Sequence, residues 1–240
     1  GTALGVSFLK NGKVFLAYPG VPSEFKKMFL DGFFKEKSDL KRSVDSIVLN
    51  TMASETRVYE RLKSFITDSK NEIKFSFLPS YKGVTVRLTS LSQSIDILKV
   101  KNETIKKLGS YIYSEGDKSL ERVVANLLMS KKLTIGVSES CTGGLLNSII
   151  SSIPNSSSFY NGGIVAYSNS LKINILNIEK DEIEKYGAVS SEVGISMAKN
   201  IAVITNSDIG ISTTGYSGPT GGDSSNSNGT VYVSIKFSDK

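Results

Sequence analysis

The sequence predicts an α/β protein of three consecutive units, of which the last is a three-layer structure with a mostly parallel sheet. Its 240 residues are 39% apolar, which is enough chain to bury one or two cores. From residue 117 onward, strand-like runs alternate with amphipathic helical runs, the pattern of a helix-covered parallel sheet. We place the units at residues 1–42, 43–116 and 117–240. A ligand site is expected beyond the carboxyl ends of the parallel strands.

The first unit begins with a predicted hairpin. The apolar runs 6–9 and 14–17 flank Asn11-Gly12, a strong signal for a two-residue turn. Ser23 is expected to cap a helix that follows. One hairpin and one helix cannot bury a core, so this unit is interpreted as the tail of a larger domain.

The second unit is predicted to be a small α/β module. Polar residues and Gly116 between residues 111 and 117 predict a loop that forms the next boundary. The expected elements before that loop are a strand at 44–49, a helix from Ser54, strands at 73–77 and 84–88, and a helix at 101–108.

The third unit has the most regular alternation of the chain. Its loop at 224–228, rich in Ser and Asn, is expected to be mobile. The expected elements are helices at 120–128, 143–152, 171–176 and 191–205, and strands at 133–137, 163–168, 209–213 and 230–237.

The composition excludes several kinds of chemistry. The chain has no histidine, so it holds no Ser-His-Asp triad and no imidazole zinc site. Its one cysteine, Cys141, excludes internal disulfides and cysteine-cluster metal sites. The net charge of +6 comes from bases interspersed with acids, which favours a small phosphorylated ligand over nucleic acid.

The chain also lacks targeting signals. No apolar stretch reaches the ~18 residues of a membrane span, and no basic segment precedes an apolar one at the start. We therefore expect no membrane partner and a cytoplasmic location. Gly1 stands where a complete chain would have Met, so it is interpreted as an internal cut.

Three strand-to-loop junctions of the third unit carry dense small polar residues, at 138–144, 166–172 and 213–222. Each junction also has an interpretation without a function. The first could cap a helix, the second could carry a solvated lysine, and the third could be a long turn. In a parallel sheet the junctions share one edge, so their side chains can meet. A serine without histidine still needs a base, and a desolvated lysine assisted by a tyrosine hydroxyl suffices. Ser140, Tyr167 and Lys172 supply that set.

The same junctions resemble those of the CinA family and its free-standing relatives, the nicotinamide-nucleotide amidohydrolases. Upstream, residues 1–3 and 19–22 look like the end of the family's molybdopterin-binding-like domain, which makes residues 1–42 its tail. The matching third-unit motifs are 138–144, 163–169 with Lys172, 186–190, and 214–219 followed by 229–232.

The resemblance implies deamidation of nicotinamide mononucleotide to nicotinic acid mononucleotide and ammonia. Ser140 is then the nucleophile, Lys172 and Tyr167 handle the proton, and amides at 142–144 or Gly215 face the oxyanion or the phosphate. No metal and no cofactor are expected for deamidation; in the full-length proteins the N-terminal domain is associated with metal-dependent ADP-ribose hydrolysis. The implied substrate-binding residues are Glu139, Thr142, Gly143, Gly144, Asn169, Thr214, Gly215 and Gly218.

Several alternatives stay open. Cys141 rivals Ser140 as nucleophile, although only one of two adjacent side chains is expected to face the pocket. Measured against the family, these residues are expected to leave out most of the N-terminal domain and the extreme C-terminus, and 224–228 stands where relatives often have a Lys-Pro loop. A nucleotide-binding protein without turnover is the rival function, and nucleic-acid binding is a distant third. The oligomeric state is open, with a homodimer as the commonest default.

Overall fold

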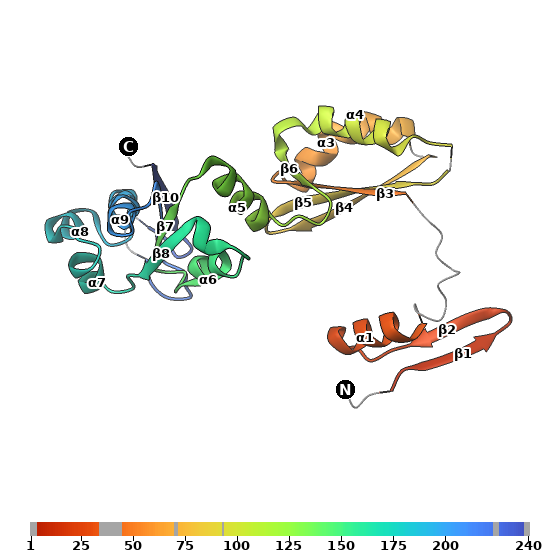
Figure 1. The fold of residues 1–240 in the computed structure, drawn as a ribbon, viewed down its shortest axis with the longest axis horizontal. Coiled ribbons are helices and arrows are strands. Elements are labelled where there is room, and N and C mark those ends of the chain that lie inside the picture. The colour runs from red at the N-terminus through yellow and green to blue at the C-terminus, as the bar shows by residue number, and fades with distance from the viewer. Residues whose placement is uncertain (1–3, 34–44, 70–71, 93, 223–225, 238–240) are drawn as a thin grey trace.

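The computed structural model describes residues 4–33, 45–69, 72–92, 94–222 and 226–237 (Figure 1). The predicted boundary between residues 42 and 43, and Ser224 and Ser225 of the predicted mobile loop, lie outside these ranges. The described strands form one two-stranded and two four-stranded sheets. Within the described ranges, no helix is long and apolar enough to cross a membrane.

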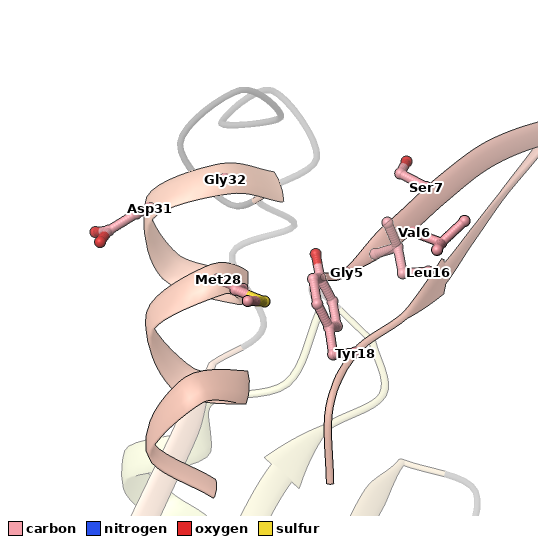
Figure 2. Close-up of a pocket in the computed structure, with 8 residues that line it drawn as sticks. All are labelled: Gly5, Val6, Ser7, Leu16, Tyr18, Met28, Asp31 and Gly32. Carbon is pink, nitrogen blue, oxygen red and sulfur yellow. The ribbon is translucent and has the colours of Figure 1, made fainter. Parts of the chain in front are cut away.

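The N-terminal unit contains the predicted hairpin, β1 (Val6–Lys10) and β2 (Lys13–Ala17). Asn11 and Gly12 both have positive φ, +51° and +72°, as a type I′ turn requires. A cavity of about 490 Å³ lies between the hairpin and the following helix (Figure 2). No described residue of this unit is buried, which agrees with the prediction that it is too small to form a core.

The helix after the hairpin starts earlier than predicted. α1 (Pro22–Met28) has Val21 at its N-cap and no side-chain cap, and a π-helical turn, η1 (Phe29–Phe33), continues it. The expectation that Ser23 caps this helix is therefore wrong. Pro22 at the first helical position has its φ preset and no N–H to satisfy, so the helix begins there without a capping hydroxyl.

The middle unit is an antiparallel sheet with two helices. The strand order is β4-β5-β3-β6, and every pairing is antiparallel. Leu49, Val58 and Leu62 are among the residues that form the core between sheet and helices. The elements are β3 (Ser46–Thr51), α3 (Glu55–Ser69), β4 (Ile73–Ser80), β5 (Gly83–Ser90), α4 (Ile97–Leu108), the 3-10 turn η3 (Gly109–Tyr111) and β6 (Ile112–Glu115).

The segment 111–117, predicted to be a boundary loop, contributes β6 to the middle sheet instead. β6 pairs with β3, and the Asn50 amide donates to Ser114 Oγ (3.0 Å) and to the Gly116 carbonyl (2.8 Å). Tyr111, Ile112 and Tyr113 are aromatic and β-branched residues, which favour strands, but the run is short and the turn residues after it obscured this signal.

The C-terminal unit has the predicted, mostly parallel sheet. Its strand order is β10-β9-β7-β8, in which β7 pairs in parallel with both β8 and β9, and β10 is antiparallel to β9. The elements are α5 (Leu120–Lys131), β7 (Ile135–Glu139), α6 (Leu145–Ser151), the 3-10 turn η4 (Ser156–Ser158), β8 (Tyr160–Val165), α7 (Asn169–Asn174), α8 (Lys180–Tyr186), α9 (Ser191–Ile204), β9 (Ile209–Gly215) and β10 (Val231–Phe237).

Helices cover both faces of this sheet, so the unit has three layers (Figure 1). α5 and α6 pack with Ile135 and Val137 on one face, and α8 and α9 form a second core on the other face. The sequence patterns predicted all of these helices except α8.

α9 lies unusually close to the sheet. A Cβ on Gly210 would be 1.8 Å from the Ala198 carbonyl oxygen, and one on Gly136 would be 2.1 Å from Thr205 Oγ1. Glycine at these two positions lets the helix approach β7 and β9, the two strands that lead into the predicted site.

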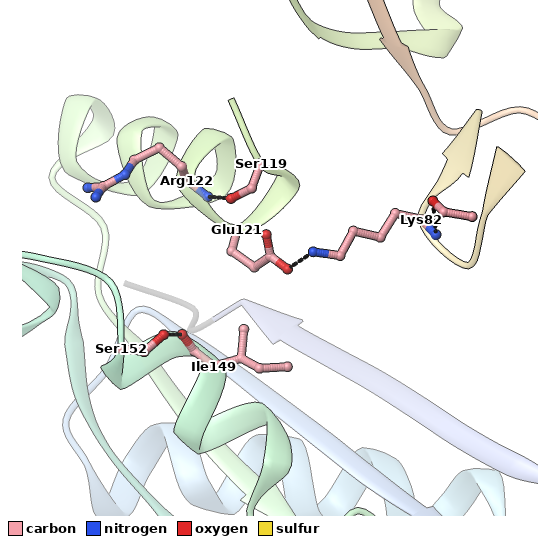
Figure 3. A network of polar contacts seen from close by, with 7 residues as sticks. Lys82, Ser119, Glu121, Arg122, Ile149 and Ser152 are labelled. Atoms are coloured by element: carbon pink, nitrogen blue, oxygen red, sulfur yellow. Dashed lines mark hydrogen bonds and ion pairs between the residues drawn. The ribbon is translucent and has the colours of Figure 1, made fainter. Parts of the chain in front are cut away.

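An ion pair joins the middle and C-terminal units. Lys82, in the turn between β4 and β5, pairs with Glu121 in the first turn of α5 (Figure 3). The hydrogen bond from Lys82 holds the pKa of Glu121 down to about 2, from a usual 4.5.

Candidate active site

Ser140 lies immediately after the central strand β7. Its N–H donates to the Thr213 carbonyl of β9 at 2.9 Å, and the Ala166 N–H after β8 donates to the Glu139 carbonyl at 2.7 Å. These two bonds continue the hydrogen bonding of β7 with β9 and with β8 up to Ser140. The serine is therefore fixed at the carboxyl edge of the sheet, where a parallel architecture places its ligand site.

Lys172, on α7, reaches Ser140. Its Nζ lies 3.0 Å from Ser140 Oγ and donates to the Ala166 carbonyl at 2.9 Å. The lysine is only 2% exposed, and this burial lowers its pKa from the usual 10.5, although Cys141 acts in the opposite direction. None of the ion pairs found among the described residues involves Lys172. Its environment thus favours the neutral amine, the form that can accept a proton.

A cavity of about 390 Å³ opens over this pair. Its wall comes from the ends of β7, β8 and β9, from the start of α7, from the segment before α9 and from the glycine-rich loop after β9. The lining residues are Ser140, Cys141, Tyr167, Asn169, Lys172, Ala188, Val189, Gly215, Tyr216, Ser217, Gly218 and Thr220.

The three predicted catalytic residues all line this cavity, together with three of the predicted substrate-binding residues, Asn169, Gly215 and Gly218. Cys141 lines it too, so the expectation that only one of the adjacent pair faces the pocket is wrong. The strand β7 ends at Glu139, so the alternation of a strand no longer applies at Ser140 and Cys141. Only Ser140 of the two is within hydrogen-bond distance of Lys172.

Tyr167 occupies the rim of the cavity rather than its floor. It is 72% exposed, and no hydrogen bond joins it to Ser140 or Lys172 within the described part of the chain. Its hydroxyl is therefore placed to meet a ligand from the solvent side.

Glu139 does not line the cavity, in contrast to its predicted substrate-binding position. It is fully buried, and its carboxylate accepts the N–H groups of Gly144 (3.1 Å), Leu146 (3.1 Å) and Asn147 (2.6 Å). The carboxylate thus caps the start of α6, where a negative charge also complements the helix dipole.

The amides of Gly143 and Gly144 are engaged inside the protein. Gly143 N–H donates to the Ser140 carbonyl at 3.1 Å, and Gly144 N–H donates to Glu139. The expectation that these amides face an oxyanion or a phosphate is therefore wrong. Both N–H groups already donate to acceptors of the protein, the Ser140 carbonyl and the Glu139 carboxylate. In contrast, the amides of Cys141 and Thr142 have no hydrogen-bond acceptor among the described residues.

Two predicted threonines support the site from behind it. Thr142 Oγ1 lies 2.7 Å from Thr213 Oγ1, and the buried Thr214 hydroxyl donates to the Ala188 carbonyl at 2.9 Å. Neither threonine lines the cavity. The Thr142 hydroxyl therefore bonds another side chain, and the Thr214 hydroxyl holds the backbone of Ala188.

Five lining residues were not predicted. Tyr216, Ser217 and Thr220 belong to the third junction, at 213–222, which could also be read as a long turn. The family resemblance includes residues 186–190 but assigns them no role. Ser190 caps α9 by accepting the Val193 N–H at 3.2 Å, which fixes the end of the segment that joins α8 to α9. This capping signal could have found the remaining two, Ala188 and Val189.

The site offers no cluster of metal ligands. Among the described residues, no group of three or more His, Cys, Asp or Glu side chains is arranged to hold an ion. The chemistry of the donor set is that of a hydroxyl and a buried amine.

Comparison with known proteins identifies the family of the C-terminal unit. Residues 117–240 match the model of the CinA C-terminal domain. The chain belongs to the CinA family. It is 37% identical over 247 aligned positions to a putative competence-damage inducible protein of Thermoanaerobacter pseudethanolicus, covering 100% of this chain and 59% of that protein. It is 36% identical over 242 positions to a CinA-like protein of Dictyoglomus thermophilum, covering 98% and 59% of the two chains.

Solved CinA-family structures are similar to part of the chain. The crystal structure of competence damage-inducible protein A from Klebsiella pneumoniae is 32% identical and covers 48% of this chain and 71% of that one, with a TM-score of 0.47. The chain spans 59% of the length of the two longer relatives named above. The names of these three proteins specify no reaction.

Proposed function

We propose that the C-terminal unit hydrolyses the carboxamide of nicotinamide mononucleotide, releasing ammonia and nicotinic acid mononucleotide. The observation that carries this proposal is the 3.0 Å contact between Lys172 Nζ and Ser140 Oγ at the floor of an open cavity. A hydroxyl beside a desolvated amine is a nucleophile with its base. The choice of substrate rests on the resemblance of the junction motifs to the nicotinamide-nucleotide amidohydrolases.

In the first half of the reaction, Ser140 Oγ attacks the carboxamide carbon while neutral Lys172 accepts the hydroxyl proton. The Ala166 carbonyl, which accepts one N–H of Lys172, orients the amine so that its lone pair can face the serine. The protonated lysine then transfers its proton to the amide nitrogen, the C–N bond breaks, and ammonia leaves an ester on Ser140.

In the second half, water attacks the ester carbon and Lys172 accepts the proton of that water. Collapse of the intermediate returns the proton to Ser140 Oγ and frees the carboxylic acid, which loses its remaining proton to water and becomes the carboxylate. One lysine therefore serves both halves, which is consistent with a chain that contains no histidine.

The negative charge that develops on the carboxamide oxygen needs hydrogen-bond donors. The amides of Cys141 and Thr142 directly follow the nucleophile and have no acceptor among the described residues. We assign them to the oxyanion, as preorganised backbone donors lower the energy of such intermediates. Tyr167 and Asn169, on the cavity wall, are assigned to the rest of the substrate.

The test is ammonia release from nicotinamide mononucleotide by the purified chain, measured together with binding of the same compound. Ammonia release that persists in EDTA supports the proposal, because the mechanism requires no divalent ion. Binding without ammonia release favours a nucleotide-binding protein, and neither binding nor release counts against both functions. Ammonia release that is lost in EDTA and restored by magnesium or manganese would contradict the metal-free mechanism.

A further inference from the structure

The cavity wall at Val189 is hydrogen-bonded to Asn226, a residue of the loop that was predicted to be mobile. Asn226 lies in the part of that loop that the structure describes, and it is only 7% exposed. Its Nδ2 donates to the Val189 carbonyl at 3.0 Å, and Val189 lines the cavity. The side chain of a loop residue is therefore directly bound to the backbone of the cavity wall.

The orientation of the Asn226 amide follows from its partners. The Val189 carbonyl can only accept, so the NH₂ group must face it. The oxygen then faces Tyr232 of β10, whose hydroxyl donates to Asn226 Oδ1 at 2.8 Å. A chain of two hydrogen bonds thus runs from the β10 strand through Asn226 to the cavity wall.

The wall segment depends on side chains for its position. Residues 187–190 form neither helix nor strand, and the neighbouring carbonyl, that of Ala188, accepts the Thr214 hydroxyl at 2.9 Å. Both cavity-lining residues of this segment therefore have their carbonyls held by side chains from other elements. Loss of either donor would leave a carbonyl without that bond and let the wall shift.

We infer that Asn226 is a positioning residue, which holds the Ala188–Val189 wall of the cavity in the geometry that receives substrate. The inference rests on the proposed function, because it assigns the wall to substrate binding. Asn226 touches neither Ser140 nor Lys172 in the bonds described, so its loss should weaken substrate binding more than it slows the chemical steps.

The decisive variant is Asn226→Asp, which keeps the shape of the side chain but replaces the donor facing Val189 by an oxygen. We expect KM for nicotinamide mononucleotide to rise about tenfold, as for a lost donor to a buried carbonyl, with kcat changed less than about twofold. Tyr232→Phe removes only the outer hydrogen bond and is expected to raise KM less, in the same direction. This milder variant keeps the test available if Asn226→Asp folds poorly.

The matched control is Asn200→Asp on α9. The Asn200 amide donates to the carbonyls of Leu176 (2.7 Å) and Asn177 (3.1 Å), which do not line the cavity. This control removes the same kind of bond, an amide donor to a backbone carbonyl, at a half-buried position in the same unit. It is expected to lower Tm while KM stays unchanged.

Hydrogen exchange of the peptides that cover residues 186–193 gives a readout that is independent of turnover. Faster exchange there in Asn226→Asp but not in Asn200→Asp, together with the rise in KM, supports the inference. Unchanged KM and unchanged exchange overturn it, as does a loss of kcat without a change in KM. If the unsubstituted chain releases no ammonia, the proposed function fails, and the exchange comparison alone decides whether Asn226 holds the wall.

Discussion

The middle and C-terminal sheets each have four strands, but only the C-terminal sheet gathers its polar groups into a site. In the antiparallel middle sheet, the buried Asn50 amide donates to Ser114 and Gly116, and its oxygen accepts the Thr85 hydroxyl at 2.8 Å. All of these bonds join neighbouring strands or a strand end. In the C-terminal unit, Lys172 of α7 instead lines the cavity, 3.0 Å from Ser140 Oγ.

The direction of the strands explains this difference. Neighbouring antiparallel strands end at opposite edges of a sheet, so the loops of the middle sheet are divided between its two edges. The parallel strands β7, β8 and β9 all end at one edge, and three loops therefore converge above Ser140. Buried polar residues thus stabilise the fold in one sheet and form a candidate catalytic pair in the other.

The largest expected effect comes from the nucleophile. Ser140→Ala is expected to lower ammonia release roughly 10³-fold or more, because the group that forms the covalent bond is removed. Cys141→Ala is expected to keep most of the activity, because the serine and not the cysteine is in contact with Lys172. Steady-state ammonia assays on both variants, with circular dichroism as a check of folding, make the comparison.

The opposite pattern would identify a different nucleophile. Loss of ammonia release in Cys141→Ala, or its loss on thiol alkylation, with Ser140→Ala still active, would make the cysteine the attacking group. Lys172 would then be the cation that stabilises its thiolate. The reaction could remain the same, but the mechanism proposed above would be wrong.

The base is expected to have the next largest effect. Lys172→Met should lower turnover roughly 10²-fold while the chain still folds, because methionine fills a similar buried space without a base. Since burial lowers the pKa of Lys172, the rate should rise with pH along a limb that lies below the usual 10.5. A pH–rate profile from pH 6 to 10 measures this limb. Near-normal turnover in the variant would remove Lys172 from the mechanism.

Much of this arrangement could be predicted from the sequence, for a physical reason. The apolar spacing and the order of strands and helices specify the parallel sheet, and that sheet brings Ser140, Tyr167 and Lys172 to one cavity. Local spacing could not show that Glu139 faces the start of α6 or that Asn226 is buried. Both depend on which neighbour each side chain meets after folding, and that is information about the packed structure.

A substitution in the middle sheet tests whether its buried polar residues affect folding but not the site. Asn50→Ala leaves the buried Ser114 hydroxyl and the Gly116 carbonyl without that partner, and is expected to cost about 1–3 kcal/mol of folding free energy. Ammonia release at a temperature where the variant is folded should be unchanged. Chemical denaturation and the ammonia assay measure the two effects. Asn102→Ala, at an exposed position of α4, is the control and should change neither.

A loss of turnover in folded Asn50→Ala would contradict the division of roles between the two sheets. It would show that a change in the middle sheet alters turnover at the site. The contact between Lys82 and Glu121 would then be the first candidate for transmitting that effect.

The smallest expected effect concerns that contact, the pair between Lys82 and Glu121 (Figure 3). The pKa of Glu121 is about 2 in the folded chain against a usual 4.5, so the pair stabilises the fold above pH 4.5, and this stabilisation is lost as the pH falls toward 2. The pair is partly exposed to solvent, so we expect no more than about 1 kcal/mol. Glu121→Gln should therefore lower the free energy of unfolding at pH 7 but have a smaller effect at pH 2.5. Glu184→Gln, which breaks a more exposed pair with Lys180 inside α8, controls for the loss of a carboxylate. An equal effect of Glu121→Gln at both pH values would show that the ion pair does not stabilise the junction of the two units.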